Sequence, residues 1–176
     1  MKKKILVITV LLLTFAFISI PVMGKPATKI EGVTIEVHST GPPVSYDGYP
    51  RFVSDGTISH ARGESSPGST VTLTIPIPGQ EPLVLDGGWH TDWIANGNWK
   101  KGEWVISSKG TMTFEGGMFV SVNQRRITGD SPMSPTAYFK DRSVWKGTGI
   151  FKGWTLKLSR EGTSDVITDG YLIMPK

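Results

Sequence analysis

The stretch VWKGTGIFKGWTLKL, residues 144–158, decides the fold class of this chain. Over its second half, from Trp154 to Leu158, apolar residues alternate with polar ones, which is the period of a β-strand with one buried face. Ahead of and beside this alternation lie three glycines within seven residues, Gly147, Gly149 and Gly153. Glycine inside a strand pattern marks a bulge, a sharp bend or a close backbone approach. We therefore expect one long strand that bends while keeping its pairing, as a small closed barrel requires.

The rest of the chain shows the same β-type patterning. Residues 71–77 alternate cleanly, and Asp55-Gly56 is a hairpin signal between two short strand segments. Residues 79–102 form the least regular part, because Asp86-Gly87-Gly88 and Asn96-Gly97-Asn98 interrupt any period. The chain contains 21 Gly and 12 Pro, and these residues interrupt every run in which apolar residues recur at helical spacing. The sequence therefore lacks the pattern of long helices. The sequence predicts an all-β fold, a single small antiparallel β-barrel of about eight strands with an irregular Trp-rich loop region.

Two segments share one pattern. Residues 109–116 and 146–153 both contain Lys-Gly-Thr, two further residues, Phe, a charged residue and Gly. We interpret them as equivalent strand corners of one barrel, with Phe114 and Phe151 pointing into the interior. The alternative is coincidence, since Gly-Thr is common in β proteins.

The first 24 residues have the features of an export signal. A basic start at Lys2, Lys3 and Lys4 precedes an apolar run over residues 5–20, and Gly24 is a small residue at the expected cleavage point. The alternative is a transmembrane helix, for which the run is short. The expected organisation is a signal peptide at 1–24, a tether at 25–31 and a barrel domain at 32–176. The mature protein would be secreted or held at the cell surface, with no stable membrane span.

Charge and composition narrow the classes of partner. Three of the 19 basic residues lie in the predicted signal, so the mature chain would carry 16 basic against 15 acidic residues. A nucleic-acid binder needs a basic patch that survives processing, so we expect no nucleic-acid partner. The absence of cysteine excludes thiol nucleophiles, Cys-ligated zinc and iron–sulfur clusters. Phosphate-binding and dinucleotide motifs are also absent, so we expect no cofactor.

The segment GTGIFKG, residues 147–153, resembles the Gly-Ser/Thr-Gly-x-Phe-x-Gly signature of allene oxide cyclases and dirigent proteins. The resemblance covers residues 144–158. It implies an eight-stranded antiparallel barrel that takes a small apolar molecule into its lumen and controls how that molecule closes or couples. No catalytic residue of those families corresponds to a residue here, so the resemblance leaves open whether the chain is an enzyme.

Four tryptophans fall within sixteen residues, Trp89, Trp93, Trp99 and Trp104. An indole has a large apolar face and one polar N–H, so such rings suit the rim of a pocket. We predict that Trp89 and Trp93, in an irregular segment, form a lid over one mouth of the barrel. The alternative is that the rings seal one end of the barrel as core.

His90 and Asp92 would share one face if the chain is extended around them. The pair could act as a base with an orienting carboxylate, or provide two metal ligands with His38 or His60 as a third. Because the three histidines have no ligand spacing, we expect no metal site and an ordinary hydrogen bond. The candidate ligand-binding residues are Trp89, His90, Trp93, Phe114 and Phe151.

These observations favour an exported β-barrel that binds a small, largely apolar ligand in its lumen. Control of the ligand's cyclisation or isomerisation by orientation alone stays open. The first alternative is a carbohydrate-binding module that uses an exposed Trp cluster, and the second is a structural surface protein. Inward-facing tryptophans would support the first hypothesis, and a flat row of exposed rings would support the carbohydrate-binding one.

Overall fold

A computed structural model describes residues 27–52, 58–98, 102–128, 138–162 and 168–175. Eleven strands and no helix occur in this part of the chain. Accordingly, no described segment is a helix long and apolar enough to cross a membrane. The predicted signal peptide lies outside the described residues.

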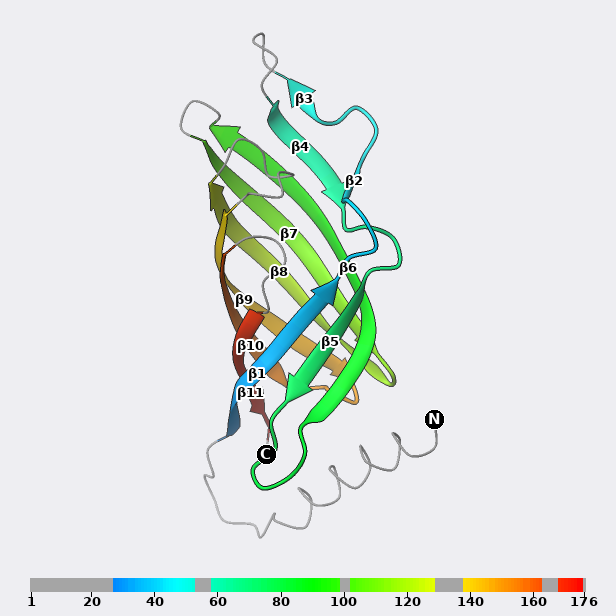
Figure 1. Cartoon of the computed structure of the whole chain (residues 1–176), viewed down its shortest axis with the longest axis vertical. Helices are drawn as coiled ribbons and strands as arrows, with labels where there is room; N and C mark the ends of the chain where they lie inside the picture. Colours follow the sequence, from blue (N-terminus) through cyan, green and yellow to red (C-terminus); the bar gives the residue numbers. More distant parts are fainter. Residues whose placement is uncertain (1–26, 53–57, 99–101, 129–137, 163–167, 176) are drawn as a thin grey trace.

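Eight antiparallel strands close into a barrel (Figure 1). Around the ring the order is β6, β5, β1, β11, β10, β9, β8 and β7, and pairing of β6 with β7 closes it. The strands are β1 (Thr28–His38), β5 (Thr70–Ile75), β6 (Leu83–Asn98), β7 (Glu103–Phe114), β8 (Gly117–Thr128), β9 (Tyr138–Gly149), β10 (Thr155–Gly162) and β11 (Thr168–Met174). The predicted all-β antiparallel barrel is confirmed.

Three short strands lie outside the ring and extend its wall at one end (Figure 1). They are β2 (Val44–Ser45), β3 (Arg51–Phe52) and β4 (Ile58–Glu64). β4 pairs with the second half of β6, from His60 opposite Asn96 to Glu64 opposite Asp92, while the first half of β6 pairs with β5. β2 and β3 both pair with β4. We call these three strands the β2–β4 extension.

The expectation of an irregular loop over residues 79–102 is wrong for most of that region. Residues 83–98 form β6, the longest strand, and Trp89 and Trp93 therefore belong to the barrel wall and not to a lid. The glycines make room for neighbours instead of ending the strand. A Cβ on Gly87 would lie 2.2 Å from the Thr113 carbonyl oxygen, and one on Gly97 would lie 2.6 Å from the Trp104 ring.

The expectation of one long bent strand over residues 144–158 is also wrong. The chain reverses between β9 and β10, and hydrogen bonds such as Gly147 N to Trp154 O (3.0 Å) close the turn. Gly149 and Gly153 have φ angles of 60° and 88°, which L side chains rarely adopt. The glycine-rich segment therefore forms a hairpin turn between two wall strands.

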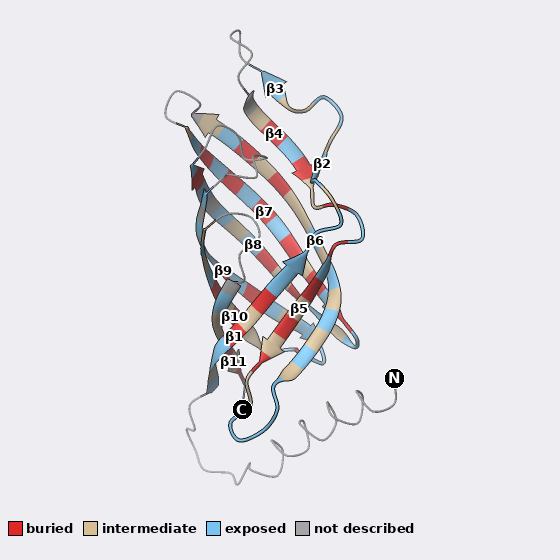
Figure 2. Ribbon diagram, viewed as in Figure 1, coloured by how far each residue is buried: buried red, intermediate tan, exposed pale blue. Residues whose placement is uncertain are grey.

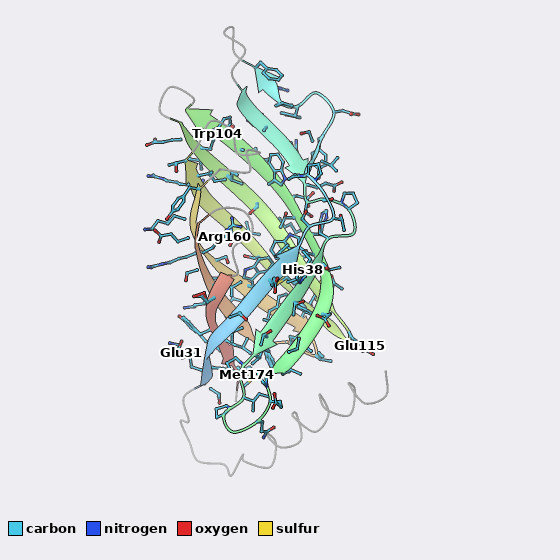
Figure 3. The ribbon with its side chains drawn as sticks, viewed as in Figure 1. Glu31, His38, Trp104, Glu115, Arg160 and Met174 are labelled. Carbon is cyan, nitrogen blue, oxygen red and sulfur yellow. The ribbon has the colours of Figure 1, made fainter. Side chains whose placement is uncertain are left out.

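The barrel interior holds two apolar clusters at opposite ends. The larger cluster, which we call the first core, includes Phe114, Phe119, Phe151, Leu73 and Leu156. The second core consists of Ala61, Trp93, Ala95, Trp104, Ile106 and Ile127 and lies beside β4. Figure 2 shows the alternation of buried and exposed residues along the wall strands, and Figure 3 places Trp104 and Met174 near opposite ends. Phe114 and Phe151 both point inward, as the shared Lys-Gly-Thr pattern predicts.

Candidate functional site

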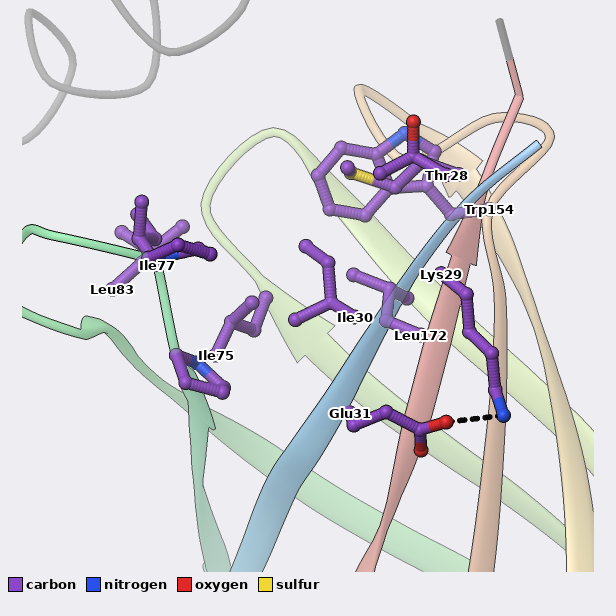
Figure 4. Close-up of a pocket in the computed structure, with 12 residues that line it drawn as sticks. Thr28, Lys29, Ile30, Glu31, Ile75, Ile77, Leu83, Trp154 and Leu172 are labelled. Atoms are coloured by element: carbon purple, nitrogen blue, oxygen red, sulfur yellow. Dashed lines mark ion pairs between the residues drawn. The ribbon is translucent and has the colours of Figure 1, made fainter. Parts of the chain in front are cut away.

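An apolar pocket of about 450 Å³ lies at the end of the barrel where β1 and β6 begin and β5 and β11 end (Figure 4). Its wall is built from the ends of these strands and from the turn before β10. The lining residues are Thr28, Lys29, Ile30, Glu31, Ile75, Pro76, Ile77, Pro78, Leu83, Trp154, Leu172 and Met174. We call it the end pocket.

The local sequence explains why this end stays open and apolar. β5 ends at Ile75, and the following Pro76 has no N–H for a ladder hydrogen bond. The apolar pattern nevertheless continues through Ile77, so side chains suited to a core extend beyond the last paired residue. Leu172 is fully buried, whereas Trp154 is only partly buried. One side of the pocket is therefore formed by the buried core, and another side is accessible to solvent.

The charged lining residues neutralise each other at the rim. Lys29 forms an ion pair with Glu31 (Figure 4), and its Nζ lies 4.0 Å from the centre of the Tyr171 ring. The hydrogen bond to Glu31 raises the pKa of Lys29 above its usual value, so the ammonium stays charged. The pocket therefore combines an apolar wall with a paired, solvent-exposed charge at its edge.

Three of the sequence-predicted site residues meet in the first core. Phe114 and Phe151 lie edge to face with ring centroids 6.0 Å apart, and Trp89 packs against the same cluster. The Phe151 ring is 5.4 Å from that of Trp154, which lines the end pocket. Phe151 therefore supports the pocket wall from behind, while Phe114 fills the interior.

Trp93 lies in the second core, together with Trp104, and both are at least nine-tenths buried. Trp89 is partly buried and its ring centre lies 5.4 Å from that of Trp145. These three tryptophans thus pack into the barrel interior and form no exposed row of rings, and Trp99 lies outside the described residues.

A polar layer separates the two cores. Ser108 lies on β7 between Ile106 and Met112 and is buried, and Ser121 and Ser143 are buried on the neighbouring strands. The hydroxyls of Ser143 and Ser121 have partners, because Trp145 Nε1 donates to Ser143 Oγ at 2.9 Å and Ser121 Oγ donates to the Val144 carbonyl oxygen at 2.7 Å. An apolar ligand is therefore better accommodated at the end pocket than in this middle layer.

His90 lies on the outer face of β6 and is exposed, unlike the aromatic residues of the predicted site, which face the barrel interior. Its Nε2 is 3.5 Å from Asp92 Oδ2, so the prediction that His90 and Asp92 share a face is confirmed. The same Nε2 is 4.0 Å from Glu64 Oε2 on β4. His38 and His60 have other neighbours, since His38 lies near Thr72 Oγ1 and His60 near Asn96.

A tyrosine fixes the position of Asp92. The Tyr46 hydroxyl donates to Asp92 Oδ1 at 2.5 Å. This hydrogen bond raises the pKa of Tyr46 to about 12 and is the main cause that lowers the pKa of Asp92 below its usual value. Asp92 is therefore an ionised carboxylate with one oxygen bonded and the other facing His90.

Sequence reasoning missed the end-pocket residues and Glu64. For the pocket, a signal existed: Ile75-Pro76-Ile77-Pro78 keeps its apolar pattern where proline prevents further pairing. For Glu64 there was none, because only the pairing of β4 with β6 brings it opposite Asp92.

Comparison with protein-family models, with curated proteins and with solved structures found no match.

Proposed function

We propose that this protein binds a small, largely apolar molecule in the end pocket of its barrel. The observation that carries the proposal is a pocket of about 450 Å³ with a predominantly aliphatic and aromatic wall. Small-molecule sites typically have volumes of about 300–1,000 Å³, mostly apolar walls and few polar groups. The end pocket has each of these properties.

The energetics favour a ligand that is mainly hydrocarbon. Burial of each methylene contributes about 0.8 kcal/mol, so a molecule with several carbons against Ile30, Leu83 and Trp154 would gain several kcal/mol before the cost of immobilisation. The rim cation Lys29 is already paired with Glu31, so the site has no strong requirement for a charged ligand. Thr28 also lines the pocket, and its hydroxyl would orient one polar group of the ligand.

The proposal differs in one respect from the expectation of a ligand deep in the lumen. The rings of Phe114, Phe119 and Phe151 pack against one another there, and an eight-stranded barrel is just wide enough to be filled by side chains. Steering of cyclisation or isomerisation, which the resemblance to allene oxide cyclases and dirigent proteins implies, stays a prediction. Export through residues 1–24 also stays a prediction.

Binding is tested with N-phenylnaphthylamine, a neutral lipophilic probe, titrated into the full chain while tryptophan emission is followed. We expect saturable quenching, because Trp154 lines the pocket. Leu83→Ala removes part of the apolar wall and should weaken binding by about 1–2 kcal/mol, or roughly fivefold to thirtyfold.

The matched control is Val84→Ala, on the next residue of β6. Val84 is 46% exposed and lies on the opposite face of the strand, so its variant should bind the probe like the original chain. Equal affinities of the two variants, or quenching by soluble oligosaccharides in place of the probe, would contradict the proposal.

A further inference from the structure

Three side chains of types that bind metals lie close together on the outer face of the sheet, where β4 pairs with β6. Glu64 is the last residue of β4, and His90 and Asp92 are two residues apart on one face of β6. One donor atom from each lies within 4.8 Å of the others. Two strands paired in fixed register hold all three, so their spacing does not depend on a loop.

We propose that Glu64, His90 and Asp92 form a binding site for a zinc ion. In tetrahedral coordination with bonds of about 2.1 Å, neighbouring donor atoms are about 3.4 Å apart. His90 Nε2 lies 3.5 Å from Asp92 Oδ2 and 4.0 Å from Glu64 Oε2. A small rotation of the flexible Glu64 side chain brings the third donor to the same spacing.

The donor chemistry selects among cations. An imidazole nitrogen with two carboxylates suits zinc, whereas calcium and magnesium prefer sites made only of oxygen. Three protein ligands leave the fourth tetrahedral position to water, because His90 and Asp92 are each about half exposed.

Tyr46 acts as an outer partner of this site. Its hydroxyl occupies Asp92 Oδ1, so Asp92 Oδ2 is left to face His90. Tyr46 is itself anchored, since its backbone N donates to the Arg62 carbonyl oxygen at 3.0 Å on β4. Hydrogen bonds of this kind orient a ligating carboxylate and are usually worth a tenfold to hundredfold change in metal affinity.

Zinc at this position would link two parts of the molecule. Among the described residues, β4 pairs with the barrel through β6, from His60 to Glu64, and its other edge pairs with the two-residue strands β2 and β3. A metal bonded to Glu64 and to both β6 residues would fasten the extension to the barrel wall. The site shares no residue with the end pocket, so it stands independently of the proposed ligand.

The test is a calorimetric titration of zinc chloride into the full chain, prepared without a polyhistidine tag. We expect one zinc ion per chain and a higher melting temperature in its presence. Glu64→Gln and His90→Ala should each weaken zinc binding by about a hundredfold or more, and Tyr46→Phe by about tenfold. Calcium chloride should bind much more weakly than zinc.

His38→Ala is the matched control. His38 is also a half-exposed strand histidine beside a carboxylate, with Nδ1 3.8 Å from Glu36 Oε1. This variant should bind zinc like the original chain. Circular dichroism of each variant separates loss of the site from loss of the fold. The Glu64→Gln variant should fold, because the glutamine side chain has nearly the same shape as glutamate and residue 64 lies at the end of β4. No zinc binding by the original chain, or unchanged affinity in folded Glu64→Gln and His90→Ala, would overturn the proposal.

Discussion

At the scale of single residues, Gly149 shows how one position can determine the path of the chain. Its φ angle is 60°, and a Cβ there would lie 2.3 Å from the carbonyl oxygen of Gly116. Two independent restrictions therefore apply, the backbone conformation and the close approach of the β7–β8 turn. Because Gly149 meets both restrictions, β9 can end there and the chain can turn, which places Trp154 in the wall of the end pocket.

We expect Gly149→Val to lower the melting temperature more than Gly48→Val, and Gly48→Val more than Gly41→Val. Gly48 has a φ of 77° but open space around its Cβ, so the valine there adds strain of about 1–3 kcal/mol without a clash. Gly41 has no positive φ and its nearest atom is 3.4 Å away. Thermal unfolding of the three variants measures the order, and equal melting temperatures for the Gly149 and Gly48 variants would show that the backbone approach is not tight.

At the scale of elements, the position of β4 depends on its packing against the second core. Ala61 and Gly63 face the second core, and a Cβ on Gly63 would lie 2.8 Å from the Trp93 ring and 2.1 Å from the Val44 carbonyl oxygen. The small residues of β4 let the strand lie directly on the tryptophan. Trp93 thus holds the β2–β4 extension against the barrel, which is a structural role in place of the lid predicted from the sequence.

Gly63→Ala should therefore loosen the extension without opening the barrel. We expect faster amide hydrogen exchange in β4 and a loss of about 1–3 kcal/mol in its local stability, because overpacking forces β2 or Trp93 to move. Gly88→Ala is the control, since nothing lies within 4 Å of that Cβ and its φ is not positive. Exchange in β4 as slow in the Gly63 variant as in the original chain would contradict this account.

The same elements show what the sequence could and could not predict. Alternating apolar residues were enough to predict the β-class, because side chains alternate in any strand. The inward-facing Phe114 and Phe151 were predicted from the Lys-Gly-Thr pattern that their two segments share. β6 was missed because a glycine weakens a strand pattern whether it ends the strand or makes room for a neighbouring ring. The position of Glu64 depends on the pairing of β4 with β6, and pairing between distant segments leaves no local signal. The end pocket did have a local signal, the apolar pattern that continues through Ile75-Pro76-Ile77-Pro78.

At the scale of the whole molecule, the barrel has two chemically different ends. One end is lengthened by the β2–β4 extension and filled by the second core, and Glu64, His90 and Asp92 lie on the outer face where β4 ends beside β6. The other keeps an apolar pocket between strand ends. The polar layer with Ser108, Ser121 and Ser143 lies between the two cores, so the ends can differ in function without sharing a continuous apolar interior.

The central claim is that a small apolar ligand occupies the end pocket, and methyl NMR tests it most directly. On titration with N-phenylnaphthylamine, we expect the methyl signals of Ile30, Ile77 and Leu83 to shift, because all three line the pocket. The methyls of Val122, which is 80% exposed on the barrel's outer face, should not move. Shifts confined to Ile106 and Ile127 of the second core, or no saturable shifts at all, would contradict the claim.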